Sequence, residues 1–302
     1  MPFLAVALFG AYGLAGVFGM VAVMYALADV TGIFRDAGLS VTSRACDPWT
    51  EVLHDLESGA TDVALGGLWV PGMSAGSSRA LTVIGQLNHT CPKVIVRREA
   101  HPDFALADLA GQVVLAPGAG GSGPYAVTAG LMREAGVDPD RVDFVRDLST
   151  SMLVELFVAE LGDAIVLDLV TAVELESAGH GHVVYRNLEH GGLMPNSVYY
   201  CRTDRVEELR DRLTRFVAGV ATAMNRLPDT PAETIDGILR TRWPGKDLAV
   251  LRQAVAQMSA GRVWERPSRS TPPPATGGCA CSPRTRCSPA SPPTTSSPTT
   301  AS

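Results

Sequence analysis

The chain has 302 residues, enough for two domains of ordinary size, and 46% of them are hydrophobic, enough to fill a core in each. The formal net charge is −6, and Lys and Arg are scattered without a basic cluster. Since nucleic-acid binding needs a concentrated positive surface, this composition indicates a globular protein whose partners do not include nucleic acid.

The apolar N-terminal segment is expected to be folded core. No Lys or Arg precedes Arg35, whereas a secretory signal needs a basic stretch ahead of its apolar part. Glycines at positions 10, 13, 16 and 19 interrupt the run before it reaches the roughly 20 apolar residues of a membrane helix. We therefore expect a buried strand at residues 3–9, a glycine turn, a buried helix at residues 17–28 and no stable membrane insertion. A membrane-spanning segment is the alternative.

Cysteine usage bears on the compartment. Cys46, Cys91 and Cys201 are far apart in the sequence, and three further cysteines lie after residue 278. Such spacing does not suggest a disulfide framework, so we expect a reducing, cytoplasmic location. A periplasmic or cell-surface location would require an N-terminal signal in addition.

Strand-like and helix-like patterns alternate along the chain. The expected strands are residues 3–9, 39–45, 62–67, 81–88, 93–97, 113–116, 142–146, 164–168 and 197–202. The expected helices are residues 17–28, 49–58, 70–75, 125–135, 152–161, 171–178, 206–227, 231–241 and 246–261.

This alternation predicts an α/β protein with parallel strands and right-handed crossovers. We expect two doubly wound lobes joined by two crossing segments, lobe 1 comprising residues 1–88 and 197–265 and lobe 2 residues 89–196. The late helices should pack back on the first lobe. A ligand site in such a fold lies between the lobes, at the carboxyl ends of the strands.

The composition changes at about residue 266. Residues 266–302 contain no aromatic side chain and nine of the 21 prolines, which does not allow a packed core. We expect a disordered tail that is rich in Pro, Ser and Thr.

A glycine-rich turn stands between the expected strand at residues 113–116 and the helix that follows. Gly118, Gly120, Gly121 and Ser122 precede the free N–H groups of that helix, where an anion is favoured. No Lys follows the glycines, so the turn is not a nucleotide P-loop. The alternative is a plain connection whose glycines only satisfy turn geometry.

Five segments, in their order and spacing, resemble the type 2 periplasmic-binding-protein fold, in its branch that binds nitrate, sulfonates, taurine and thiamine-pyrimidine precursors. They are GIFRDAGL at 32–39, LESGATDVAL at 56–65, DLAGQVV at 108–114, LMREAGV at 131–137 and LGDAIV at 161–166. The resemblance implies a solute-binding protein of the ABC-importer type. Its partners would be a small anionic or zwitterionic ligand, sulfonate-like or pyrimidine-precursor-like, and an ABC permease, and we expect no cofactor and no metal.

The resemblance also implies which turns line the pocket. Its expected ligand contacts are Tyr12, Cys46, Asp47, Gly67, Trp69, Gly118, Gly120, Gly121, Ser122, Asp168, Asn196 and Tyr199. Tyr12 and Trp69 would offer aromatic faces to a planar ligand. Each position also has a structural reading as a turn or core residue, and Asp168 has a competing one as the cap of a helix.

A cytoplasmic enzyme on the same fold is the alternative function, resembling the desulfinases or a biosynthetic enzyme. Its nucleophile would be Cys46, at a strand end before a helix, with His54 or His89 as the base. The competing interpretation of Cys46 is a small buried side chain.

Overall fold

The computed structural model describes residues 2–9, 22–46, 51–117, 123–146 and 148–264. Six expected site residues lie outside these ranges, and so do residues 266–302. The six are Tyr12, Asp47, Gly118, Gly120, Gly121 and Ser122. Residues Met1–Ser268 belong to one compact unit.

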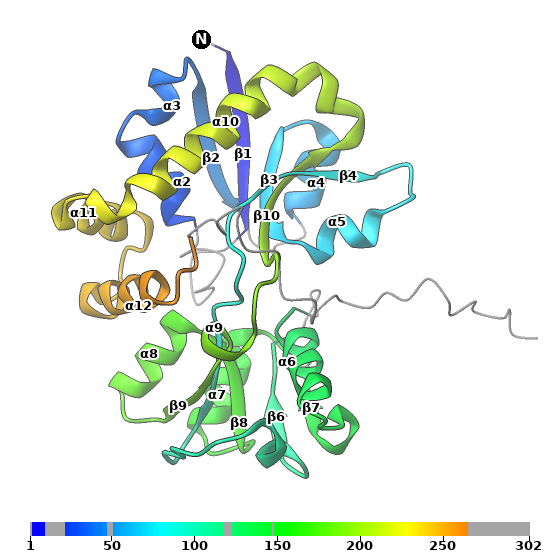
Figure 1. Ribbon diagram of the computed structural model, residues 1–302, viewed down its shortest axis with the longest axis vertical. Helices are drawn as coiled ribbons and strands as arrows, with labels where there is room; N and C mark the ends of the chain where they lie inside the picture. The colour runs from blue at the N-terminus through cyan, green and yellow to red at the C-terminus, as the bar shows by residue number, and fades with distance from the viewer. Residues whose placement is uncertain (1, 10–21, 47–50, 118–122, 147, 265–302) are drawn as a thin grey trace, which may run out of the picture. The chain divides into compact units, whose positions relative to one another are not determined.

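The first sheet has five strands in the order β2-β1-β3-β10-β4 (Figure 1). Their bounds are Phe3–Phe9 for β1, Ser40–Cys46 for β2, Val63–Gly67 for β3, Leu81–Gln86 for β4 and Ser197–Arg202 for β10. Strand β1 is parallel to β2 and β3, and β10 is antiparallel to both of its neighbours, β3 and β4. The expected βαβαβ unit is therefore present, and the sheet as a whole is mixed.

Helices cover both faces of this sheet. On one face, Leu65 and Tyr199 join a core with α2 (Val23–Val30), α3 (Ile33–Asp36) and α10 (Val206–Arg226). On the other face, Ala64 and Tyr200 pack with α4 (Glu51–Ser58) and α5 (Trp69–Ser74). Neighbouring residues along β3 and β10 thus enter opposite cores, as the period of a strand requires.

The N-terminal apolar segment contributes to the first of these cores. Leu4 and Val6 of β1 are buried, and so are all residues from Ala22 to Ala28. Helix α2 ends at Val30 rather than at Ala28 as expected, and the first part of the expected helix lies outside the described residues. Among the helices of the described ranges, none has the length and apolar character that crossing a membrane requires.

The second sheet also has five strands, in the order β7-β6-β8-β5-β9. Their bounds are Lys93–Arg97 for β5, Val113–Leu115 for β6, Asp143–Val145 for β7, Ala164–Asp168 for β8 and His182–Arg186 for β9. Strand β6 is parallel to β7 and β8, whereas β5 is antiparallel to β8 and β9.

Two separate cores sandwich this second sheet. Val94 and Leu167 face α7 (Thr150–Val158) and α8 (Leu169–Ser177). Ile95 and Val166 face α6 (Gly123–Glu134) and the short helix η1 (Leu106–Leu109). The remaining helices are α9 (Asn187–His190), α11 (Ala232–Arg242), α12 (Leu248–Ala260), η2 (Pro139–Arg141), η3 (Thr203–Arg205) and η4 (Leu227–Asp229).

The structure corrects two expectations. The stretch around residues 180–190 contains strand β9, which the sequence analysis did not predict, although Val183, Val184 and Tyr185 have strand-forming side chains. Helices α10 and α11 pack on α2 as expected, but α12 packs on α8. The Nζ of Lys246, in the turn before α12, lies 2.6 and 2.7 Å from the carboxylate oxygens of Glu174 on α8. The limits proposed for the two lobes stay a prediction.

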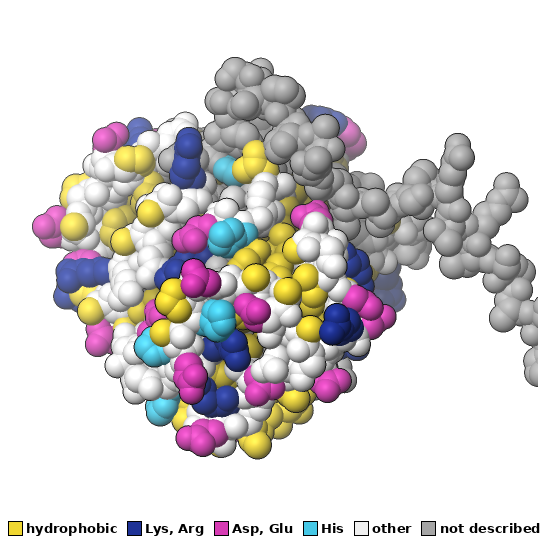
Figure 2. Space-filling model, turned by 60° about the horizontal axis from the view of Figure 1, so that its bottom comes forward, with side chains coloured by type: hydrophobic (Ala, Val, Ile, Leu, Met, Phe, Trp, Pro, Cys, Tyr) yellow, Lys and Arg dark blue, Asp and Glu magenta, His cyan; other side chains and the backbone are white. Residues whose placement is uncertain are grey.

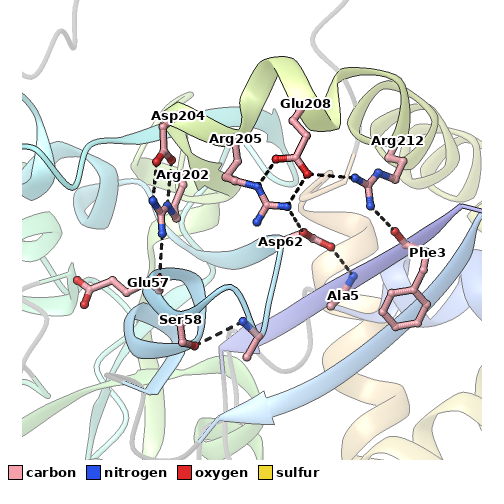
Figure 3. Close-up of polar contacts among 11 residues, drawn as sticks. Phe3, Ala5, Glu57, Ser58, Asp62, Arg202, Asp204, Arg205, Glu208 and Arg212 are labelled. Carbon is pink, nitrogen blue, oxygen red and sulfur yellow. Dashed lines mark hydrogen bonds and ion pairs between the residues drawn. The ribbon is translucent and has the colours of Figure 1, made fainter.

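A network of arginines lies where β1 and β3 begin and β10 ends (Figure 3). Asp62 accepts hydrogen bonds from the Ala5 N–H (3.1 Å) and from Arg205 (3.4 Å), and Arg205 also pairs with Glu208. Arg212 donates to the Phe3 carbonyl at 2.8 Å. These contacts fix α10 to the amino edge of the first sheet. The positive charges of the arginines in this network are paired with nearby carboxylates.

Close packing of α10 on α3 predicts opposite effects at two helical glycines. A Cβ on Gly219 of α10 would lie 2.8 Å from the Phe34 ring, whereas a Cβ on Gly237 of α11 would meet no atom within 4 Å. We expect Gly219→Ala to lower the free energy of unfolding by about 1–3 kcal/mol through overpacking. Gly237→Ala should raise it by up to about 1 kcal/mol, because Ala favours helix. Urea unfolding of both variants checks this; equal effects would contradict the packing.

Candidate ligand-binding site

Both sheets direct their carboxyl edges to the segments that connect them. In the first sheet, β1 and β2 end together at Phe9 and Cys46, and β3 ends at Gly67 opposite Ser197, where β10 begins. In the second sheet, β8 ends at Asp168 opposite Lys93, where β5 begins.

The chain passes between these edges twice. Residues 87–92 lead from the end of β4 to the start of β5, and residues 187–196, which include α9, lead from the end of β9 to the start of β10 (Figure 1). Both segments therefore start at one carboxyl edge and finish at the other. This is the place where α/β folds bind ligands, in the crevice outside the carboxyl ends of the strands.

Hydrogen bonds hold the two crossing segments together at the first sheet. The Ser197 N–H donates to Asn88 Oδ1 at 2.6 Å, and the Leu87 N–H donates to the Ser197 carbonyl at 2.9 Å. The Met194 N–H donates to the His89 carbonyl at 2.8 Å. Asn88 and Ser197 are fully buried, so these bonds are shielded from water. The two crossing segments are therefore hydrogen-bonded to each other at the carboxyl edge of the first sheet.

Gly67 and Trp69 lie at the carboxyl end of β3, as expected. A Cβ on Gly67 would lie 2.3 Å from Nε1 of the half-buried Trp69, so only glycine permits the observed position of the indole. The Leu68 N–H donates to the Asn196 carbonyl at 3.0 Å, which fixes the turn to the second crossing segment. The structure thus brings Gly67, Trp69 and Asn196 together.

Asp168 has the capping role that competed with ligand contact. It is the N-cap of α8, and its two carboxylate oxygens accept from the Thr171 N–H at 2.9 Å and the Thr171 hydroxyl at 2.8 Å. Both residues are buried. Its carboxylate therefore fixes the start of α8 at the edge of the site.

Lys93 is a residue that the sequence analysis did not single out for the site. Burial lowers the pKa of its ammonium group, while the negative charge of Asp168 acts in the opposite direction. Burial also disfavours the charged form of the neighbouring Cys91, so the pKa of its thiol is raised. Asn187 Nδ2 lies 4.0 Å from the Cys91 Sγ. A lysine that begins the apolar strand Lys-Val-Ile-Val-Arg was the available signal, because a cation at such a place is costly to bury.

Other expected site residues are placed differently. Tyr199 is 1% exposed and packs edge-on against Phe216 with ring centroids 5.0 Å apart, inside the core of the first sheet. Its position is structural, and its assignment as a ligand contact stays a prediction. His54 is exposed on α4, and Cys46 ends β2 with a side chain outside the described part, so their catalytic pairing also stays a prediction.

Two further observations concern the described surface. On the face in Figure 2, Lys and Arg side chains are interspersed with Asp and Glu, so this face forms no basic patch. A hollow of about 360 Å³ lies between α3 and α10, lined by Ile33, Arg215 and Thr222 among others. None of its lining residues belongs to a carboxyl edge or a crossing segment. Within the described residues, no three His, Cys, Asp or Glu side chains are grouped to hold a metal.

Solved structures share this architecture. The alkanesulfonate-binding protein SsuA from Xanthomonas axonopodis pv. citri, bound to MOPS, matches with a TM-score of 0.65 and 15% identity, covering 88% of this chain and 95% of its own. The periplasmic aliphatic sulphonate-binding protein SsuA from Escherichia coli matches with a TM-score of 0.68 and 16% identity, covering 85% and 83%. The periplasmic nitrate-binding protein NrtA from Synechocystis PCC 6803 matches with a TM-score of 0.62 and 13% identity, covering 83% and 69%.

The two mixed sheets, their crossing segments and these similarities define a protein of the type 2 periplasmic-binding-protein fold. Residues 21–234 match the NMT1/THI5-like family, and the chain belongs to that family. Among curated proteins, none matches the sequence.

The close approach at Gly67 predicts a spectroscopic effect. Gly67→Ala should displace the Trp69 indole, change the tryptophan emission and lower the free energy of unfolding by about 1 kcal/mol. Gly72→Ala on α5 is the matched control, because a Cβ there would meet no atom within 4 Å. Trp69→Phe identifies the part of the emission that belongs to Trp69. Identical spectra for Gly67→Ala and Gly72→Ala would refute the arrangement.

The buried Tyr199 hydroxyl predicts a pH effect. The hydroxyl has no hydrogen-bond partner among the described residues, and burial raises the Tyr199 pKa. Tyr199→Phe should therefore keep or raise stability at neutral pH, by about 1 kcal/mol. Above about pH 10 the unfolded wild-type chain loses this proton first, so wild-type stability should fall relative to the variant.

Urea unfolding of both proteins between neutral pH and about pH 11 measures the difference between their free energies of unfolding, which should widen as the pH rises. A difference that narrows as the pH rises would contradict the burial of this hydroxyl. Weaker ligand binding by a stable Tyr199→Phe protein would instead make Tyr199 a ligand contact.

Proposed function

We propose that the chain is an ABC-type solute-binding protein for a small anion or zwitterion with sulfonate-like or pyrimidine-precursor-like chemistry. The observation that carries this proposal is the meeting of two carboxyl edges at two crossing segments in a chain of the NMT1/THI5-like family. The partner that follows from this class is an ABC permease, which would receive the ligand.

The chemistry of the described edge supports an anionic group on the ligand. The crossing segments contribute amide and hydroxyl donors, and Lys93 contributes a cation at the start of β5. A group of arginines lies at the opposite, amino edge of the first sheet, where Asp62, Asp204 and Glu208 pair with it (Figure 3). An anion would therefore be attracted to the carboxyl edge rather than to the arginine network.

The proposal makes a prediction about ligand charge. Titration calorimetry of the full chain with methanesulfonate, taurine, nitrate and a hydroxymethylpyrimidine should give saturable binding for at least one of them. Methanesulfonamide, which is similar in size to methanesulfonate but uncharged, should bind at least about tenfold more weakly, as expected for loss of a charged hydrogen bond. Native mass spectrometry of the purified protein would identify any ligand that copurifies.

The same experiment separates binding from catalysis. Cys46→Ser should leave the affinity nearly unchanged, and the bound compound should be recovered intact. Formation of a product that stops in Cys46→Ser would favour the enzyme, since a hydroxyl does not replace a thiolate nucleophile. No binding by any of the four compounds would reject this ligand class.

A further inference from the structure

Lys93 lies at the carboxyl edge of the second sheet on a defined face. It is paired with Asp168 across β5 and β8, two residues before the next same-face pair, Ile95 and Val166. Ile95 and Val166 pack in the core with α6. Because side chains alternate along a strand, Lys93 lies on the α6 face, at the edge where β8 ends.

The Lys93 ammonium lacks a direct partner in the part of the chain that the structure describes. Among the described residues, no carboxylate lies within 4 Å of it and no acceptor receives a hydrogen bond from it. The other lysine of the whole sequence, Lys246, is held at 2.6 and 2.7 Å by Glu174. A half-buried cation without a contact partner is unfavourable, so a bound anion would stabilise it.

Asp168 does not supply that contact. Both of its carboxylate oxygens are engaged by Thr171, which holds them at the start of α8. Its charge acts on Lys93 through space and opposes the effect of burial on the Lys93 pKa. The carboxylate thus helps to keep Lys93 charged while leaving its N–H groups available.

Two neighbouring donors in the first crossing segment also lack partners. Nδ2 of Asn88 and the hydroxyl of Thr90 are buried without a hydrogen-bond partner in the ranges that the structure describes, and the two residues are 0% and 7% exposed. Buried polar groups in native proteins are almost always satisfied. Together with Lys93, residues 88–93 therefore offer three donor side chains without acceptors.

We infer that residues 88–93 hold the oxyanion group of the ligand, with Lys93 as the residue that supplies the charge. This inference rests on the proposed function and adds to it the part of the ligand that the first crossing segment recognises. It assigns a sulfonate, nitrate or carboxylate group to the Lys93 end of the segment. Asn88 and Thr90 supply neutral donors from the same segment.

The test compares Lys93→Met and Lys93→Arg in the full chain, with methanesulfonate and nitrate as probes in calorimetry. Methionine keeps much of the side-chain length without the charge, and arginine keeps the charge. We expect Lys93→Met to weaken binding about 10- to 100-fold, in keeping with a charge-assisted hydrogen bond, and Lys93→Arg to retain most of the affinity. Lys246→Met is the matched control and should bind like the wild type.

A second readout detects the contact without relying on a variant. Reductive methylation with ¹³C-formaldehyde labels the two lysines and the α-amino group, and the Lys246→Arg and Lys93→Arg variants assign the two lysine NMR signals. Addition of methanesulfonate should shift the Lys93 signal and raise the Lys93 pKa, and should leave the Lys246 signal in place.

The outcomes distinguish the two proposals. Wild-type binding that Lys93→Met retains, with an unmoved Lys93 signal, overturns this inference and leaves the proposed function standing. Wild-type protein that binds neither probe, yet binds an uncharged compound, overturns the inference together with the anionic ligand class. Weakened binding by Lys93→Met with rescue by Lys93→Arg supports the inference.

Discussion

The antiparallel insertion of β10 into the first sheet, and of β5 into the second, determines where the rest of the structure can place a ligand. Strands β1, β2 and β3 run in one direction, and β10 starts beside the end of β3, at Gly67. Strand β5 starts in the same way beside the end of β8, at Asp168. Because of these two pairings, each crossing segment joins the carboxyl edge of one sheet to the carboxyl edge of the other. The turns that could contact a ligand lie at these two edges.

The two edges of the first sheet then have separate roles. At the amino edge, Arg202 binds the Glu57 carbonyl of α4 and the Asp204 carboxylate of η3. Arg205 binds Asp62 and Glu208, and Arg212 binds the Phe3 carbonyl, so these charges are used within the fold. At the carboxyl edge, the first crossing segment contains the buried Asn88 amide nitrogen and Thr90 hydroxyl, which find no hydrogen-bond partner among the described residues. A buried donor without an acceptor lowers the stability of the folded state, and such unfavourable groups are typical of functional sites.

Much of the fold could be predicted from the sequence, since apolar runs such as Lys93–Arg97 and Ala164–Asp168 have the length and composition of buried strands. Strand β9 was missed because its valines are flanked by glycines and histidines, which resemble a surface turn. The contact of α12 with α8 depends on tertiary packing, which periodicity does not report.

The site was predictable in part. The turn at Gly67 and the cap at Asp168 follow from their places at strand ends, and the structure puts both at a carboxyl edge. Tyr199 was assigned to the pocket because it is close to a crossing segment, but strand alternation directs its ring to Phe216. The sequence signal at Lys93 is a cation at the start of an apolar strand. Its pairing with Asp168, which is 75 residues away and already engaged by Thr171, depends on the fold and is not contained in that signal.

If the carboxyl edges and the crossing segments form the ligand site, bound ligand should protect their backbone amides from exchange with solvent. Hydrogen exchange followed by mass spectrometry, with and without saturating methanesulfonate, measures this protection. We expect slower exchange in peptides that contain residues 67–69, 88–93 and 187–196, and unchanged exchange in α3 and in the part of α10 that lines the surface hollow. Protection confined to α3 and α10, with none at the crossing segments, would contradict this location of the site.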